Sequence, residues 1–122
     1  MNWITPADAR LLVQKNQALL FDVREKDEVT LGVAEGAKWI PLSKLQASPL
    51  EWQKFVSQLP KDRPVIFYCA GGIRSGYVVE DLENSGWPNA LNMGGYSDWV
   101  SSRLPISMDV TEADLTPKAP KP

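Results

Sequence analysis

The chain has 122 residues, of which 43% are hydrophobic and 23% are charged, a balance typical of one globular domain. Its net charge of -2 and isoelectric point near 5.1 argue against a general nucleic-acid-binding protein, which would carry a clustered basic surface. No segment approaches the ~20 apolar residues of a membrane span and no signal-peptide pattern is visible, so we expect a cytoplasmic protein without a membrane partner.

The first elements alternate between helix and strand. Thr5-Pro6-Ala7-Asp8 has the pattern of a helix start and predicts a helix that runs to about Lys15. The apolar run 18–23 predicts a strand, and residues 25–31 predict a short helix that Gly32 closes. Residues 37–40 predict a second strand.

Further elements continue this alternation. Ser48-Pro49-Leu50-Glu51 predicts the start of a helix ended by Pro60, with one apolar side formed by Leu50, Phe55, Val56 and Leu59. The continuous apolar run 64–68 is typical of a strand buried on both faces.

A helix with Val78, Val79 and Leu82 on its inner side is predicted to follow and to end at Gly86. Residues 90–92 predict a last strand, and Gly94-Gly95 a tight turn. A short helix is expected over 96–103, with Trp99 and Val100 facing inward.

This alternation predicts an α/β fold: a mostly parallel central sheet of about five strands with helices on both faces. We expect one domain over residues 1–104 and a proline-containing tail over 105–122 that is partly disordered. Ligands of such sheets bind beyond the carboxyl ends of the strands, where the segment after residue 68 lies.

Two features of the composition restrict the catalytic chemistry. The chain contains one cysteine, Cys69, so neither an intrachain disulfide nor a second resolving thiol is available. It contains no histidine, which excludes Ser-His-Asp and Cys-His catalysis and the usual imidazole zinc sites. A nucleophile in this chain therefore needs activation by groups other than imidazole.

Cys69 begins the segment Cys69-Ala70-Gly71-Gly72-Ile73-Arg74-Ser75, between a predicted strand and a predicted helix. Glycines let such a loop curl so that several backbone N–H groups point at one atom, beside the positive end of the helix dipole. Helix N-termini and nearby cations lower a cysteine pKa from ~8.5 to ~3.5–7.5. A lone cysteine is often a small buried hydrophobe, but this loop favours an ionised Cys69, activated by the helix and Arg74.

Four segments, in the expected order, resemble the signatures of single-domain rhodaneses. The first two are Leu20-Phe21-Asp22-Val23-Arg24 with Glu28, and Gly32, Gly36-Ala37 and Ile40-Pro41-Leu42. The other two are Tyr68 to Ser75, and Asn92-Met93-Gly94-Gly95-Tyr96 with Trp99. The resemblance covers nearly all of residues 3–104. It departs at Val33-Ala34, where relatives commonly carry a histidine, and we expect this to affect local packing more than activity.

The resemblance implies a rhodanese-like fold and a sulfurtransferase of the thiosulfate sulfurtransferase type, with catalytic Cys69 carrying sulfur as a persulfide. A small anionic donor such as thiosulfate would supply the sulfur, and cyanide, a thiol or a protein would accept it, without a metal or organic cofactor. The implied substrate-binding residues are those of the loop: Ala70, Gly71, Gly72, Ile73, Arg74 and Ser75. Asp22 and Arg24 would support the loop; the alternative is a surface ion pair with Lys26 or Glu28.

Several alternatives stay open. Ser75 can bond the sulfur or cap the helix, and Ile73 can wall the site or only pack. A rhodanese-like module that delivers or senses sulfur for a partner is a second function. Phosphatase or arsenate reductase activity is a third, which loop length disfavours: four residues separate Cys69 from Arg74, whereas the phosphatase-type loop has five.

Overall fold

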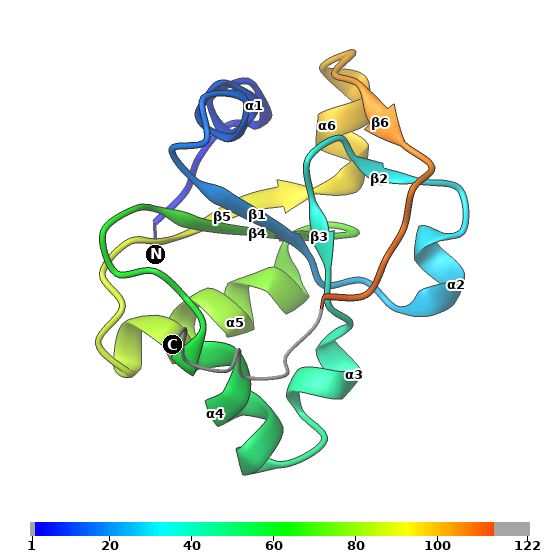
Figure 1. Cartoon of the computed structure of the whole chain (residues 1–122). Coiled ribbons are helices and arrows are strands. Elements are labelled where there is room, and N and C mark those ends of the chain that lie inside the picture. The colour runs from blue at the N-terminus through cyan, green and yellow to red at the C-terminus, as the bar shows by residue number, and fades with distance from the viewer. Residues whose placement is uncertain (1, 114–122) are drawn as a thin grey trace, which may run out of the picture.

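The computed structural model describes residues 2–113 and contains a central sheet of four parallel strands (Figure 1). The strand order is β3 (Lys38–Trp39), β1 (Leu19–Asp22), β4 (Val65–Cys69) and β5 (Ala90–Gly95). Every neighbouring pair is parallel, which confirms the predicted sheet type. About five strands were predicted, whereas the sheet of the described residues has four.

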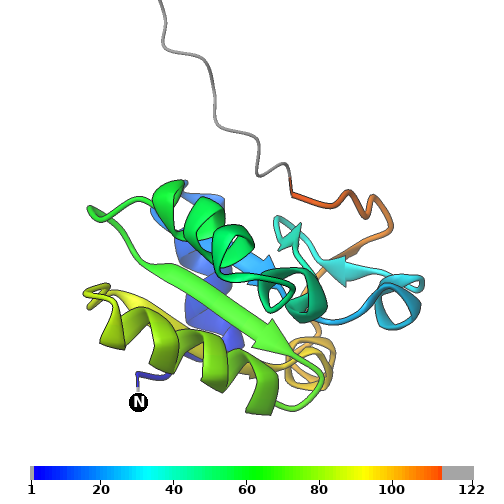
Figure 2. The same cartoon turned by 90° about the horizontal axis from the view of Figure 1, so that it is seen from below.

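Helices cover both faces of this sheet, as predicted. In Figure 1, α1 (Pro6–Gln14) and α6 (Tyr96–Ser101) lie above the sheet. The helices α3 (Leu42–Leu45), α4 (Pro49–Ser57) and α5 (Ile73–Asn84) lie below it, and Figure 2 shows them from that side.

Strand β4 forms the middle of the core because all five of its residues are buried. Its side chains alternate between the two faces. Phe67 and Cys69 pack in the cluster on the side of α4 and α5, whereas Ile66 and Tyr68 pack in the cluster on the side of α1 and α6. This alternation places the cysteine side chain on the face that α5 covers.

Local capping signals correctly predicted where two helices begin. The hydroxyl of Thr5 accepts the Asp8 N–H at 3.1 Å, and the hydroxyl of Ser48 accepts the Glu51 N–H at 3.2 Å. The apolar side predicted for α4 is partly wrong, because Leu50 is 58% exposed.

The prediction for Val100 on α6 is also wrong. Trp99 is completely buried, but its neighbour Val100 is 48% exposed. Adjacent residues on a helix project about 100° apart, and on α6 only Trp99 of the two points into the core.

A small antiparallel pair, β2 (Val33–Ala34) and β6 (Ile106–Ser107), lies beside the carboxyl ends of the parallel strands. It contains Val33 and Ala34, where the sequence departs from the resemblance and a change in local packing was expected. Ala34 is buried, and its N–H donates to the phenol oxygen of Tyr68 at 2.9 Å. Burial raises the pKa of Tyr68, so this phenol stays neutral.

Residues 105–113 run back across the domain. The indole N–H of Trp99 donates to the Pro105 carbonyl at 2.8 Å, and the Ala113 N–H donates to the Trp39 carbonyl at 2.7 Å. The rest of the predicted tail, 114–122, lies outside the described residues. No helix within residues 2–113 is long and apolar enough to span a bilayer.

Candidate active site

The candidate site is the turn between β4 and α5. Strand β4 ends at Cys69, and α5 begins at Ile73 with Gly72 as its N-cap residue. Gly72 has a φ of 103°, a conformation that residues with a side chain rarely adopt. The double glycine thus lets the chain reverse tightly enough to place the helix start beside the end of its own strand.

Three groups of the loop lie within hydrogen-bonding distance of the cysteine sulfur. The Gly72 N–H donates to Cys69 Sγ at 3.0 Å, and the Ser75 N–H approaches it at 3.5 Å. The Ser75 hydroxyl lies 3.4 Å from the same sulfur. Ser75 is completely buried, and it bonds the sulfur from the first turn of the helix.

These contacts favour the ionised form of the cysteine. Burial by itself raises the pKa of Cys69, because Cys69 is only 1% exposed. Hydrogen bonds from the Ser75 hydroxyl and from the backbone N–H groups of Ser75, Gly72 and Gly71 outweigh burial, so the pKa lies below its ordinary value. The thiol is therefore covered and activated at the same time.

The double glycine at the end of β5 packs against the backbone of the cysteine loop. Gly94 and Gly95 were predicted as a tight turn, but they form the last part of the strand. A Cβ on Gly95 would overlap the Ala70 carbonyl, and one on Gly72 would lie 3.2 Å from the Gly94 Cα. The loop therefore packs backbone against backbone, which leaves no room for side chains at these positions.

Arg74 is bound by an acidic side chain from another element. Its two terminal nitrogens donate to the two oxygens of Glu28 at 2.6 and 2.8 Å. Glu28 lies on α2 (Lys26–Val29), and both side chains of the pair are 30% exposed. The bond to Arg74 lowers the pKa of Glu28 to about 2. Arg74 thus ties the loop to α2.

Asp22 and Arg24 form a buried pair behind this contact. Asp22 is completely buried and Arg24 is 5% exposed, so the surface ion-pair alternative is wrong. The Arg24 guanidinium donates to both Asp22 oxygens at 2.8–3.1 Å and to the carbonyls of Glu28 and Gly32, each at 2.9 Å. It also lies 4.0 Å from the centre of the Tyr96 ring. This pair holds the segment that presents Glu28 to the loop.

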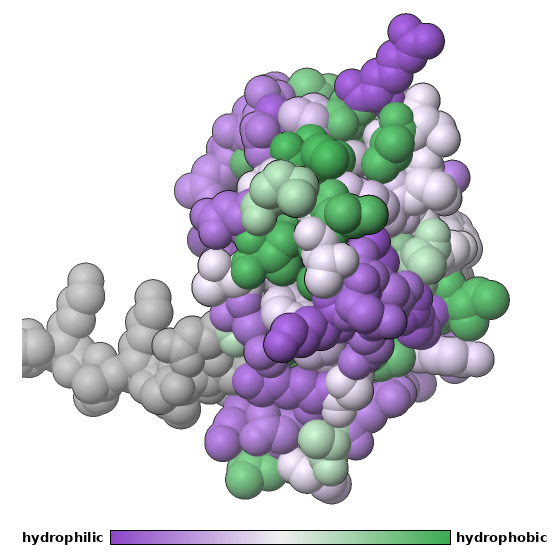
Figure 3. All heavy atoms as spheres, turned by 90° about the vertical axis from the view of Figure 1, so that its right-hand side faces the viewer, coloured by the Kyte–Doolittle hydropathy of each residue, from purple (hydrophilic) through white to green (hydrophobic). Residues whose placement is uncertain are grey.

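The outer rim of the loop is exposed. Ala70 and Gly71 are exposed, and Ile73 is 72% exposed, so Ile73 does not pack into the core. Figure 3 shows the side of the molecule toward which β4 and β5 point, with apolar patches among polar side chains. Leu31 and Met108 are exposed apolar residues of the neighbouring α2 and β6 region.

Sequence reasoning missed a buried polar residue of the site, Asn92. It is completely buried on β5, and its side-chain amide bonds both the Gly72 carbonyl and the Ser75 hydroxyl. The signal in the sequence was a polar residue between Leu91 and Met93 in a strand covered on both faces.

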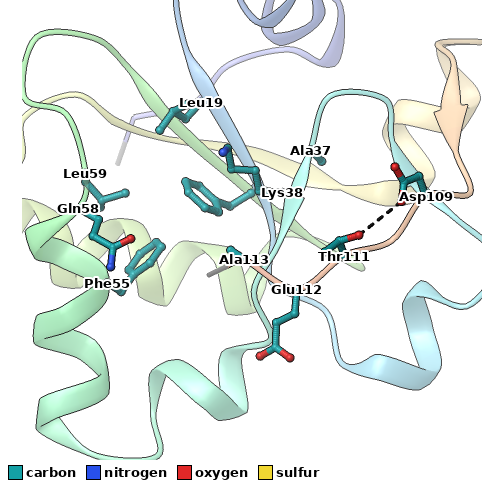
Figure 4. Close-up of a pocket in the computed structure, with 11 residues that line it drawn as sticks. Leu19, Ala37, Lys38, Phe55, Gln58, Leu59, Asp109, Thr111, Glu112 and Ala113 are labelled. Atoms are coloured by element: carbon teal, nitrogen blue, oxygen red, sulfur yellow. Dashed lines mark hydrogen bonds between the residues drawn. The ribbon is translucent and has the colours of Figure 1, made fainter. Parts of the chain in front are cut away.

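A cavity of about 720 Å³ lies elsewhere, between β1, β3, α4 and residues 109–113 (Figure 4). Phe55 and Leu59 line one side of it, and Lys38 and Glu112 line another. Cys69, which carries the one thiol of the chain, is not among the residues that line this cavity. We therefore assign the candidate site to the cysteine loop and not to this cavity.

Comparison with known proteins gives a consistent result. The model of the Rhodanese-like domain family matches residues 5–102. A protein named sulfurtransferase from Allochromatium vinosum is 32% identical over 96 residues, which cover 78% of this chain and 83% of that protein. The human thiosulfate:glutathione sulfurtransferase is 32% identical over 101 residues, covering 76% of this chain and 88% of its own.

Solved structures agree with this assignment. The crystal structure of a rhodanese-related protein from Thermoplasma volcanium has a TM-score of 0.71 at 27% identity, covering 89% of this chain and 100% of its own. Family model, relatives and fold thus coincide over the segment that contains the cysteine loop. The chain belongs to the rhodanese-like domain family.

Proposed function

We propose that this protein is a sulfurtransferase in which Cys69 carries sulfane sulfur as a persulfide. The observation that carries the proposal is the position of Cys69 Sγ, 3.0 Å from the Gly72 N–H at the start of α5. An anionic sulfur at that point receives backbone hydrogen bonds and the positive end of the helix dipole. Relatives named as sulfurtransferases support the same chemistry.

The reaction is a double displacement. The Cys69 thiolate attacks the outer sulfur of a donor such as thiosulfate and forms a new S–S bond. The S–S bond of thiosulfate breaks, and its electron pair leaves with sulfite. An acceptor nucleophile, cyanide or a thiolate, then attacks the outer sulfur and the Cys69 thiolate is regenerated. Both steps transfer a neutral sulfur atom without a net redox change.

The groups around the sulfur have distinct roles in this proposal. The N–H groups of Gly72 and Ser75 stabilise the thiolate and the anionic persulfide. Arg74 orders the loop through Glu28, and Asp22 and Arg24 hold the chain that presents Glu28. Because Cys69 is 1% exposed, a donor reaches it only after displacing the rim, where Gly71 has open space around it and Ile73 is exposed.

Transfer to an external acceptor follows from the single cysteine. With no second thiol to resolve the persulfide, the outer sulfur leaves only to an incoming nucleophile. A thiol such as glutathione or a protein thiol fits this role. Cytoplasmic location, where such thiols are kept reduced, fits the same chemistry.

Phosphate chemistry is a weaker candidate. The loop has four residues between Cys69 and Arg74, one fewer than a phosphatase-type loop. Arg74 is also held by both oxygens of Glu28, so the cation that would grip a phosphate dianion already has a partner. A regulatory module without turnover is a further alternative, and the intact cysteine loop argues against it.

Turnover assays separate these functions. The native chain and a Cys69→Ser variant are assayed for thiocyanate formed from thiosulfate and cyanide, and for sulfite released with glutathione as acceptor. We expect turnover in the native chain and none in Cys69→Ser. Turnover that persists in Cys69→Ser, or release of phosphate from an aryl phosphate without any sulfur transfer, would overturn the proposal.

A further inference from the structure

Asn92 is a polar side chain placed where the fold otherwise buries apolar ones. It lies on β5 and faces α5, and it is completely buried. Its Nδ2 donates to the Gly72 carbonyl at 2.9 Å. Its Oδ1 accepts the Gly94 N–H at 2.9 Å and the Ser75 hydroxyl at 2.8 Å. Burying an amide is unfavourable unless such bonds are made, so the amide is held in one orientation by its bonds to these three residues.

Two of the residues that Asn92 binds are the residues that contact the cysteine sulfur. Gly72 points its carbonyl at Asn92 and its N–H at Cys69 Sγ. Ser75 places its hydroxyl between Asn92 Oδ1 and the same sulfur. The amide of Asn92 therefore bonds two of the residues that surround the reactive atom.

We propose that Asn92 is a positioning residue that holds the Gly72 N–H and the Ser75 hydroxyl against the Cys69 sulfur. This inference rests on the proposed function, in which those groups stabilise the thiolate and the persulfide. The Gly72 contact dominates, because its N–H makes the shortest hydrogen bond to the sulfur. The Gly72 carbonyl also accepts the Gly76 N–H at 3.0 Å, and it is linked to the Gly72 N–H through the φ and ψ angles of a glycine, so the bond from Asn92 adds a second restraint on this residue.

The Ser75 contact is a shared one. The hydroxyl has one hydrogen and two acceptors, Asn92 Oδ1 and an ionised Cys69 sulfur. While the cysteine is a thiol, the hydrogen lies toward Asn92. When the sulfur is anionic, the hydroxyl turns its hydrogen to the sulfur and Asn92 keeps the bond from Gly94. Asn92 therefore bonds Ser75 only while the cysteine is a thiol, and in the anionic state it restrains the loop through the Gly72 carbonyl.

The test is the pH profile of Cys69 alkylation by iodoacetamide in the full chain. An Asn92→Leu variant removes the amide, and we expect the cysteine pKa to rise by about one unit. At a pH below the cysteine pKa of both chains, the variant would then hold about one tenth of the thiolate of the native chain. The matched control is Met93→Ala, which perturbs the same strand from the opposite face, where Met93 packs beside Tyr68 and Trp99. The control should lose stability and keep the native cysteine pKa.

A second variant keeps the test valid if Asn92→Leu does not fold. Asn92→Ala removes the donor to the Gly72 carbonyl and adds neither bulk nor charge, so a rise in the cysteine pKa cannot come from a new negative charge. A rise in the cysteine pKa is expected here too. All variants keep the same charged side chains near the loop. These are the ion pair of Arg74 with Glu28, and Asp98, which accepts the Gly95 N–H.

An unchanged cysteine pKa in a folded Asn92 variant, or an equal rise in Met93→Ala, would overturn the inference. The alkylation measurement needs no sulfur donor, so it is independent of the turnover assays. Failure of native turnover would remove the proposed function and leave the role of Asn92 in holding the loop measurable. Native turnover with an unaltered pKa in the Asn92 variants would remove this inference alone.

Discussion

Replacing Gly72 by alanine tests how the loop activates Cys69. Alanine at a φ of 103° is strained, and left-handed conformations cost residues with a Cβ about 1–2 kcal/mol. The added Cβ would also lie 3.2 Å from the Gly94 Cα, a backbone atom of β5 that moves only if the strand moves. We expect the free energy of unfolding to fall by about 1–3 kcal/mol.

The same substitution should displace the N–H that bonds the sulfur. A hydrogen bond to a charged group contributes about 1.5–3 kcal/mol. One pKa unit corresponds to about 1.4 kcal/mol, so complete loss of the bond would raise the cysteine pKa by about one to two units. The change is measured as the pH midpoint of iodoacetamide alkylation, and the stability by urea unfolding.

Gly71→Ala is the matched control. A Cβ on Gly71 meets no atom within 4 Å, and Gly71 is exposed, so this variant adds the same methyl group without a clash. We expect its stability and its cysteine pKa to stay near the native values. A Gly72→Ala variant that folds with a native cysteine pKa would refute the reasoning that the Gly72 N–H activates the sulfur.

Three further variants probe the surroundings of the loop. Glu28→Gln should cost about 1 kcal/mol at neutral pH, because the pair with Arg74 is partly screened by solvent. The folded pKa of Glu28 is about 2, below its ordinary 4.5, so the difference from the native chain should be complete above about pH 4.5 and disappear as the pH falls to about 2 in urea titrations. A difference that persists at pH 2 would contradict the ion pair. Asp22→Asn should cost about 3–5 kcal/mol in the same titrations, because it leaves the Arg24 cation buried without its carboxylate, and a loss below 1 kcal/mol would contradict this. Ile73→Ser should change the free energy of unfolding by less than about 0.5 kcal/mol in thermal melts, since the side chain is 72% exposed, and a larger loss would mean that it packs in solution.

Features written in local sequence were predictable. Thr5 and Ser48 were identified as caps because a hydroxyl before a proline satisfies free N–H groups of the first helical turn. The continuous apolar run 64–68 predicted the buried strand, which the structure places at 65–69, and the glycines predicted the cysteine loop. Each of these depends on interactions among residues close together in the chain.

Features that depend on distant residues were not predictable in this way. The bond between Arg74 and Glu28 joins residues 46 positions apart, and the sequence offers several acidic partners for Arg74. The pairing of β2 with β6 likewise joins Val33 to Ser107. Helical periodicity suggested that Leu50 and Val100 point inward, but both are exposed. Which residues at the margin of an apolar helix face become buried depends on how the helix lies on the sheet.

The central claim, that Cys69 bears sulfane sulfur, is tested most directly by intact-mass measurement. The native chain is incubated with thiosulfate or polysulfide, freed of excess donor, and measured before and after addition of cyanide. We predict one added sulfur atom on the native chain, its disappearance with cyanide, and no addition to Cys69→Ser. A native chain that gains no sulfur from either donor, or a Cys69→Ser chain that gains the same mass, would contradict the account.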